Sequence, residues 1–311
     1  MTILVVDAGN TRIKWAILTR RAGTHKCRQR QDAGSDQGVL DNALDNTGQA
    51  ERPPHSADHF QTFAAQYWAP LARPARVVVA NVAGPDFGET LAAWVKQAWD
   101  IEAEFVVSQP SACGIHNAYL DPQKLGVDRW AGMIATHRNV KGAACVIGCG
   151  TAITFDVLTA SGEHQGGLIV PGLALMRRAL LENTQGILNK MGDTMSDTSG
   201  ETAILARDTQ GGVNGGTLYT VIAVIDRVTS DLAAELGVGM GKGMTCVITG
   251  GDAPALLPLL AGDYRHEPLL VLQGLAMIAA APSILNPSLH SPATLVEPFA
   301  VALPCTSEDT Q

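Results

Sequence analysis

Charged residues are scarce in this sequence of 311 residues, where they make up 17% of the chain, and an acidic excess leaves a formal net charge of -8. Aromatic residues contribute only 5%. An acidic chain lacks the positive field that binds nucleic acids or anionic membranes without specificity. Hydrophobic residues make up 46% of the chain, enough to bury sizeable sheets, which excludes global disorder.

Long apolar runs and paired cysteines are also missing. No window of about 18 apolar residues predicts a membrane span, and the opening apolar run stops at Asp7, too short for the core of a secretory signal. The six cysteines are scattered without a CxxC pair, so we expect reduced thiols and a cytoplasmic protein. Cys145 and Cys149 flank a predicted buried strand, which favours core packing over a metal site.

The length fits two packed domains, and apolar runs of strand length alternate with helical periodicity, which predicts an α/β protein. Residues 20–58 are polar, and we expect there an exposed excursion with at most a short helix near residues 38–44. Strands are expected at residues 3–6, 13–18, 76–82, 104–107, 144–147, 152–158, 166–170 and 245–248, and helices at residues 60–71, 89–99, 125–138, 213–236 and 273–281.

The segment DAGNTRIK, residues 7–14, interrupts the first two predicted strands. Gly9 and Asn10 supply turn chemistry, so the strands should form a hairpin. Successive backbone N–H groups in such a turn suit phosphate oxygens, with Lys14 adding a positive charge and Asp7 able to hold a hydrated magnesium ion. The same residues also suit an ordinary tight turn, and this segment alone does not decide between the two interpretations.

The same scheme returns in the second half of the chain. GTAITFD at residues 150–156 again places glycine and a hydroxyl residue before a strand, and this time the motif ends in Asp156. A third element, ITGGD at residues 248–252, puts two glycines directly after a strand, where an adenine could lie against backbone. Three such elements in this order favour nucleotide binding, with the two hairpins clamping one polyphosphate from opposite lobes.

Asp128 and Arg129 stand in the first turn of a predicted amphipathic helix. A carboxylate near a nucleotide can deprotonate an acceptor hydroxyl, and an arginine beside it can bind an anionic group. An acid at this position is also a common helix-capping residue, with the arginine as its solvated neighbour. Both interpretations remain open from the residue types alone.

Taken together, these residues resemble the type III pantothenate kinases, the family also called Bvg accessory factor proteins, within the acetate and sugar kinase, heat-shock ATPase and actin superfamily. The resemblance covers about residues 1–285 and rests on an ordered set of motifs: DAGNTRIK at 7–14, GVDRW at 126–130, GTAITFD at 150–156, GGLIVPG at 166–172 and ITGGD at 248–252. It implies two similar ribonuclease H-like lobes of the actin-like ATPase type with a nucleotide cleft between them. The lobes would span residues 1–118 and 119–286, followed by a peripheral tail at 287–311.

The resemblance implies ATP-dependent phosphorylation of the primary hydroxyl of pantothenate to 4′-phosphopantothenate, the first step of coenzyme A synthesis. It further implies a homodimer whose interface contributes to the substrate pocket. Asp128 would accept the proton. The residues implied to contact ATP are Asp7, Ala8, Gly9, Asn10, Thr11, Arg12, Ile13, Lys14 and Thr151, and those implied to contact pantothenate are Tyr119, Gly126, Val127, Asp128, Arg129 and Thr202.

One position departs from the family pattern. Family members usually carry aspartate three residues before the threonine of GTA, where it holds a potassium or ammonium ion, and here that residue is Gly148. Glycine removes both the charge and the ligand, which argues against a bound monovalent cation. The departure also keeps a second hypothesis open: a nucleotide-binding accessory protein without catalysis that affects gene expression through a partner. No helix-turn-helix motif or basic stripe supports direct DNA binding.

Overall fold

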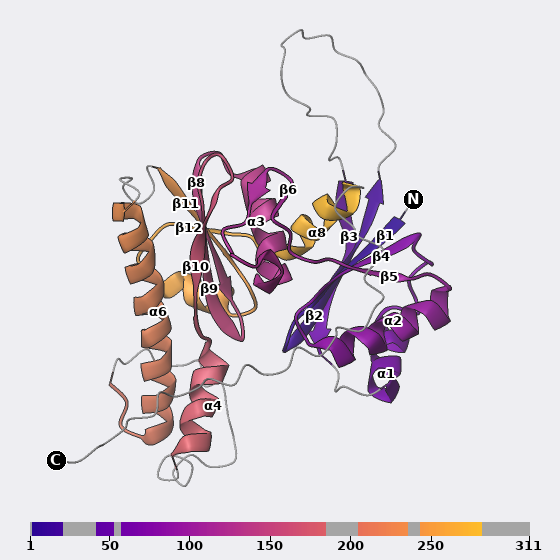
Figure 1. Cartoon of the computed structure of the whole chain (residues 1–311). Coiled ribbons are helices and arrows are strands. Elements are labelled where there is room, and N and C mark those ends of the chain that lie inside the picture. The colour runs from indigo at the N-terminus through magenta and orange to yellow at the C-terminus, as the bar shows by residue number, and fades with distance from the viewer. Residues whose placement is uncertain (1, 21–41, 53–56, 185–204, 236–242, 282–311) are drawn as a thin grey trace, which may run out of the picture.

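The structure is a computed structural model that describes residues 2–20, 42–52, 57–184, 205–235 and 243–281 (Figure 1). Within these residues, one sheet has five strands in the order β3-β2-β1-β4-β5. β1 (Thr2–Ala8) pairs antiparallel with β2 (Arg12–Arg20) and parallel with β4 (Arg76–Asn81). β3 (Asn42–Glu51) adds antiparallel to β2, and β5 (Ala103–Phe105) adds parallel to β4.

The second sheet repeats this topology, with the order β10-β9-β8-β11-β12 in the described residues. Its antiparallel meander is β8 (Ala143–Cys149), β9 (Ala152–Leu158) and β10 (His164–Pro171). β11 (Met244–Thr249) and β12 (Tyr264–His266) extend it on the other side in parallel. The internal repeat expected from the two turns is therefore present as two sheets of the same strand order.

The helices divide between the outer faces of the sheets and the space between them (Figure 1). Their bounds are α1 (Ala57–Tyr67), α2 (Pro85–Trp99), α3 (Val127–Asn139), α4 (Leu173–Asn183), α6 (Thr209–Glu235), α7 (Ala253–Leu256) and α8 (Leu270–Ala280), with short 3-10 turns η1 (Pro122–Lys124) and η2 (Leu257–Leu259). A small two-stranded ribbon, β6 (Ser111–Ala112) and β7 (Ile115–His116), precedes α3.

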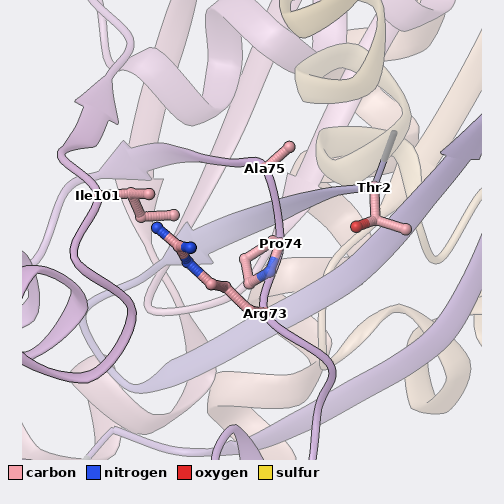
Figure 2. A pocket seen from close by; sticks show the side chains of 5 residues that line it. All are labelled: Thr2, Arg73, Pro74, Ala75 and Ile101. Atoms are coloured by element: carbon pink, nitrogen blue, oxygen red, sulfur yellow. The ribbon is translucent and has the colours of Figure 1, made fainter.

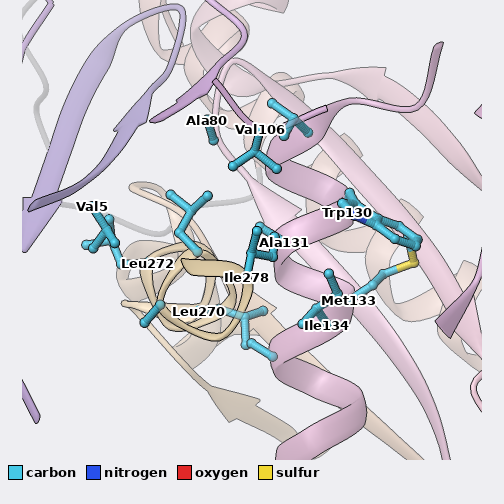
Figure 3. Packing of buried hydrophobic residues seen from close by; sticks show 14 of the residues in the cluster. Val5, Ala80, Val106, Trp130, Ala131, Met133, Ile134, Leu270, Leu272 and Ile278 are labelled. Atoms are coloured by element: carbon cyan, nitrogen blue, oxygen red, sulfur yellow. The ribbon is translucent and has the colours of Figure 1, made fainter. Parts of the chain in front are cut away.

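α3 and α8 pack against each other between the two sheets (Figure 3). Their apolar side chains join Val5 and Ala80 of the first sheet with Val146 and Val247 of the second in one buried cluster. The helices approach closely because residue 274 is glycine: a Cβ there would overlap the backbone of Ala131. This shared core connects the sheets that carry the two turns.

The outer faces have their own cores. α1 and α2 cover the first sheet with an aromatic cluster in which Phe60 and Trp68 are almost fully buried. α6 and α7 cover the second sheet, where Phe155 of β9 and Ile225 of α6 belong to the same cluster, and α4 packs beside α6. None of the helices in the described residues is both long and apolar enough to cross a membrane.

The expected strands and helices are confirmed where the structure describes them, with one exception in residues 20–58. Residues 42–51 form β3, so a helix reaching residue 44 is wrong; residues 21–41 and 53–56 lie outside the described residues, as does the tail 287–311. β3 forms without apolar alternation because, as an edge strand, it is held by its hydrogen-bonded pairing with β2. Gly48 lies under the indole of Trp15, where a Cβ would overlap the ring.

Candidate active site

The two predicted turns meet in space. The hydroxyl of Thr11, in the β1–β2 turn, lies 2.8 Å from the hydroxyl of Thr151, in the β8–β9 turn. Each turn is closed by its own backbone, with the N–H of Gly9 donating to the carbonyl of Arg12 at 3.0 Å and that of Gly150 to Ala152 at 3.1 Å. Both hairpins are confirmed, and they face each other.

The loop after β11, residues 250–252, joins this junction as a third element. The N–H of Asp252 donates to the carbonyl of Cys149 at 3.1 Å. Gly250 has a φ of 104°, and a Cβ there would overlap the Cys149 backbone. Gly251 lies against the guanidinium of Arg12, since a Cβ on Gly251 would come 2.5 Å from Nη1 of that arginine. The ITGGD motif therefore contacts both turns.

Asp7 and Asp128 form the electrostatic centre of the site. Asp7, one residue before the end of β1, pairs with Lys14 in the hairpin register, and Asp128 lies in the first turn of α3. Burial, and to a lesser extent the charge of Asp128, raise the pKa of Asp7 to about 7, while Lys14 opposes the rise. Burial also raises the pKa of Asp128, against the N–H of Arg129, which donates to Asp128 Oδ1 at 2.9 Å. The fold thus brings the half-buried carboxylate of Asp128 close enough for its charge to act on Asp7.

Arg129 takes part in a buried network behind Asp128. Its Nε and Nη2 donate to the two carboxylate oxygens of Asp156 at 2.8 and 2.6 Å, and its Nη1 donates to the hydroxyl of Tyr119 at 2.9 Å. Burial alone would lower the pKa of Arg129, but hydrogen bonds and charge from Asp156 outweigh it and raise the pKa. Much of this guanidinium is therefore committed to holding α3 against β9.

His164 of β10 completes the network. Its Nδ1 accepts from the N–H of Ala118 at 3.4 Å, which leaves Nε2 as the donor to Asp156 Oδ1 at 3.0 Å. The rings of His164 and Tyr119 stack with centroids 6.1 Å apart. Asp156, which ends the GTAITFD motif, is almost fully buried and fixes Arg129.

The other predicted contacts occupy varied positions. Ala8 and Ile13 are fully buried, so only their backbone can reach a ligand, and Val127 packs into the core between the sheets. Gly126 is the N-cap of α3, where a Cβ would come 2.7 Å from Asp128 Oδ1. Thr202 lies outside the described residues.

Metal-binding clusters of three or more His, Cys, Asp or Glu side chains are absent from the part of the chain that the structure describes. Cys145 and Cys149 are fully buried, which confirms core packing.

A cavity of about 450 Å³ lined by Thr2, Arg73 and Ile101 lies elsewhere (Figure 2). Thr2 begins β1 and Asp7 lies near its end, so this cavity is not part of the turn junction.

Sequence reasoning missed Arg52, which follows β3. Its N–H donates to the carbonyl of Thr11 at 2.8 Å, and its Nε donates to the carbonyl of Asn10 at 2.8 Å. No motif marked it, because it stands in the polar segment 20–58. Its two bonds to the first turn come from pairing of β3 with β2.

The order of these motifs matches a known family. The family profile described as Type III pantothenate kinase matches residues 3–231. The chain belongs to this family. A type III pantothenate kinase of Nitrosococcus oceani is 41% identical over 285 residues, covering 89% of this chain and 93% of that protein. One of Nitrosospira multiformis is 34% identical over 277 residues, covering 89% and 90%.

Solved structures support the fold. A Baf family protein from Campylobacter jejuni has a TM-score of 0.51 at 17% identity, over 90% of this chain and 99% of that chain. A protein from Sinorhizobium meliloti described as a candidate 2-dehydro-3-deoxygalactonokinase has a TM-score of 0.52 at 14% identity, over 93% and 100%. At these identities the similarity concerns the fold alone, the two-lobed sugar kinase and actin-like ATPase architecture.

Proposed function

We propose that this protein transfers the γ-phosphoryl group of ATP to the primary hydroxyl of pantothenate, giving 4′-phosphopantothenate and ADP in the first step of coenzyme A synthesis. Family membership supports the reaction class, and the relatives at 41% and 34% identity bear the name of this activity. The structural observation that carries the proposal is the position of Asp128: its charge acts on Asp7, at the edge of the first turn.

The proposed roles follow from these positions. Asp128 takes the proton of the alcohol while the alcohol oxygen bonds to the γ-phosphorus. At the same time the bond between the γ-phosphorus and the oxygen of the departing ADP breaks. Burial raises the pKa of Asp128, which makes its carboxylate a stronger base than that of an exposed aspartate. The turns around Thr11 and Thr151 hold the polyphosphate, so catalysis is chiefly positioning and electrostatic stabilisation.

Two neighbouring carboxylates whose charges repel fit a hard divalent cation, and Asp7 is the proposed magnesium ligand. Magnesium there would supply charge neutralisation on the phosphates.

We further propose that no monovalent cation is required. Residue 148 is glycine and supplies no carboxylate, and even a Cβ there would come 2.7 Å from Oγ1 of Thr154. Activity should therefore be the same with potassium, ammonium or neither.

Pantothenate is proposed to bind beside Asp128, near Tyr119, Gly126, Val127 and Arg129, with Thr202 as a further contact. Because the Arg129 guanidinium already bonds Asp156 and Tyr119, its part would be to shape this pocket and offer its remaining N–H groups.

The domain boundary between residues 118 and 119 is likewise proposed. A cytoplasmic location is supported by the four described cysteines Cys113, Cys145, Cys149 and Cys246, which are free thiols.

A homodimer is also proposed, and an apolar surface supports it. A groove of about 710 Å³ lies between α4 and α6 and is lined by Leu175, Met176 and Leu180 among others. Leu168 and Ile169 of the adjacent edge strand β10 are 50% and 60% exposed. A patch of this kind suits a second copy of the chain. Leu175→Glu should convert a dimer to a monomer in light scattering; a monomeric wild type would contradict the proposal.

The deciding experiment measures ADP release with and without pantothenate and detects 4′-phosphopantothenate by mass. Pantothenate-dependent ADP release is expected from the wild type, with a loss of about 100-fold or more in kcat for Asp128→Asn. Asp86→Asn, an exposed acid in the first turn of α2, is the matched control. Tight ATP binding without turnover in the wild type would instead support the accessory-protein hypothesis.

A further inference from the structure

Arg52 reaches the first turn through two separate bonds. Its backbone N–H donates to the carbonyl of Thr11, and its side-chain Nε donates to the carbonyl of Asn10, each at 2.8 Å. The guanidinium also lies over the ring of Phe87, with Cζ 5.6 Å from the centroid. Because Phe87 is fully buried in α2, it fixes the plane from which Arg52 donates.

These two bonds determine the direction of two successive peptide units. In a trans peptide the N–H points opposite to the carbonyl of the same unit. The Asn10 carbonyl shares its unit with the N–H of Thr11, and the Thr11 carbonyl shares its unit with the N–H of Arg12. With both carbonyls directed toward Arg52, both N–H groups point away from it. Two consecutive N–H groups on one side form an anion-binding nest.

The same turn carries groups suited to a phosphate. The hydroxyl of Thr11 contacts that of Thr151, and the guanidinium of Arg12 lies against Gly251. A turn that relaxed around Asn10 would lose the common direction of its N–H groups, since glycine and asparagine tolerate several turn conformations.

We propose that Arg52 is a positioning residue for the nucleotide: it holds the Asn10–Thr11–Arg12 backbone so that two N–H groups face the ATP phosphates. This inference rests on the proposed function for the identity of the anion. Arg52 acts through the turn, so it sets the affinity for MgATP and leaves the affinity for pantothenate unchanged. The role also explains the polar strand β3, which delivers Arg52 to the turn.

The test is calorimetric titration of full-length protein with MgATP, which needs no turnover. Arg52→Met should weaken binding about tenfold, the loss expected for one charge-assisted hydrogen bond, and Arg52→Lys should recover part of it. Peptides covering residues 9–13 should exchange amide hydrogen faster in Arg52→Met. In kinetics, KM for ATP should rise while KM for pantothenate stays constant. Arg73→Met is the matched control, because Arg73 also donates to a backbone carbonyl, that of Asp100 at 3.4 Å.

MgATP affinity within twofold of wild type in folded Arg52→Met would overturn the inference, as would a wild type that does not bind MgATP. If Arg52→Met fails to fold, Arg52→Lys decides by the same criterion: unchanged affinity with unchanged exchange refutes the positioning role. A wild type that binds MgATP but does not phosphorylate pantothenate would defeat the proposed function alone, because the Arg52 comparison is made on binding.

Discussion

The hydroxyl of Thr11 and the hydroxyl of Thr151 lie 2.8 Å apart, although 140 positions separate them in the chain. Each belongs to the turn of a different sheet, and the two sheets share one strand order. The contact therefore marks the place where the two halves of the repeat present equivalent groups to each other.

Replacing these two threonines tests whether both hydroxyls serve one ligand. We expect Thr11→Val and Thr151→Val each to raise KM for ATP. The effect of the double variant should differ from the sum of the two single effects by a coupling free energy of about 1 kcal/mol. Steady-state kinetics on all four proteins measures this coupling. Additive effects within error would mean that the hydroxyls act on separate groups.

Asp7 should make stability depend on pH. Its folded pKa of about 7, raised first by burial and then by Asp128, lies above the ordinary value, so the protonated form favours folding. That stabilisation is complete below the unfolded pKa, near 4, and is lost as pH rises through about 7.

Asp7→Asn removes this titration. Its gain in stability over wild type should therefore grow between pH 5 and pH 8, by on the order of 1 kcal/mol once the partial exposure of the site is allowed for. Urea denaturation without magnesium measures it, with the exposed Asp263→Asn as control. An equal gain at both pH values would show that ionisation of Asp7 does not destabilise the fold.

The adjacent glycines after β11 should respond differently to alanine. Gly250→Ala forces a side chain onto a φ of 104° and into the Cys149 backbone, so we expect a loss of about 1–3 kcal/mol or more. Gly251→Ala meets only the flexible end of Arg12, so stability should be kept while KM for ATP rises severalfold. Thermal melts and kinetics distinguish them; equal destabilisation would contradict the described geometry.

The buried network should be costly to break. Asp156→Ala leaves the cation of Arg129 without its carboxylate partner, and we expect a loss of about 3–5 kcal/mol in the free energy of unfolding. Asp231→Ala removes an exposed ion pair, Arg227 to Asp231 at 2.7 Å, and should have little measurable effect. Urea denaturation compares them. Similar small losses would indicate that water replaces Asp156.

Much of the fold follows from local sequence. The run of residues 76–82 predicts a strand buried on both faces, and β4 is buried along Val77, Val78 and Val79. The helix at Asp128 follows from its apolar spacing. β3 was missed because its residues carry no alternation, and its structure depends on pairing with β2. Arg52 was missed for the same reason, since only that pairing brings it to Asn10.

The amino-acid sequence alone was enough to predict most of the strands, the polar turns that interrupt them, and the family to which the ordered motifs belong. Those features depend on residue type and spacing over a few positions. The tertiary structure decided that Asp7 lies near Asp128, that Arg129 is held by Asp156, and that Arg52 supports the first turn. These relations depend on how α3 and β3 pack against distant strands, because burial and charge act through space and not along the chain.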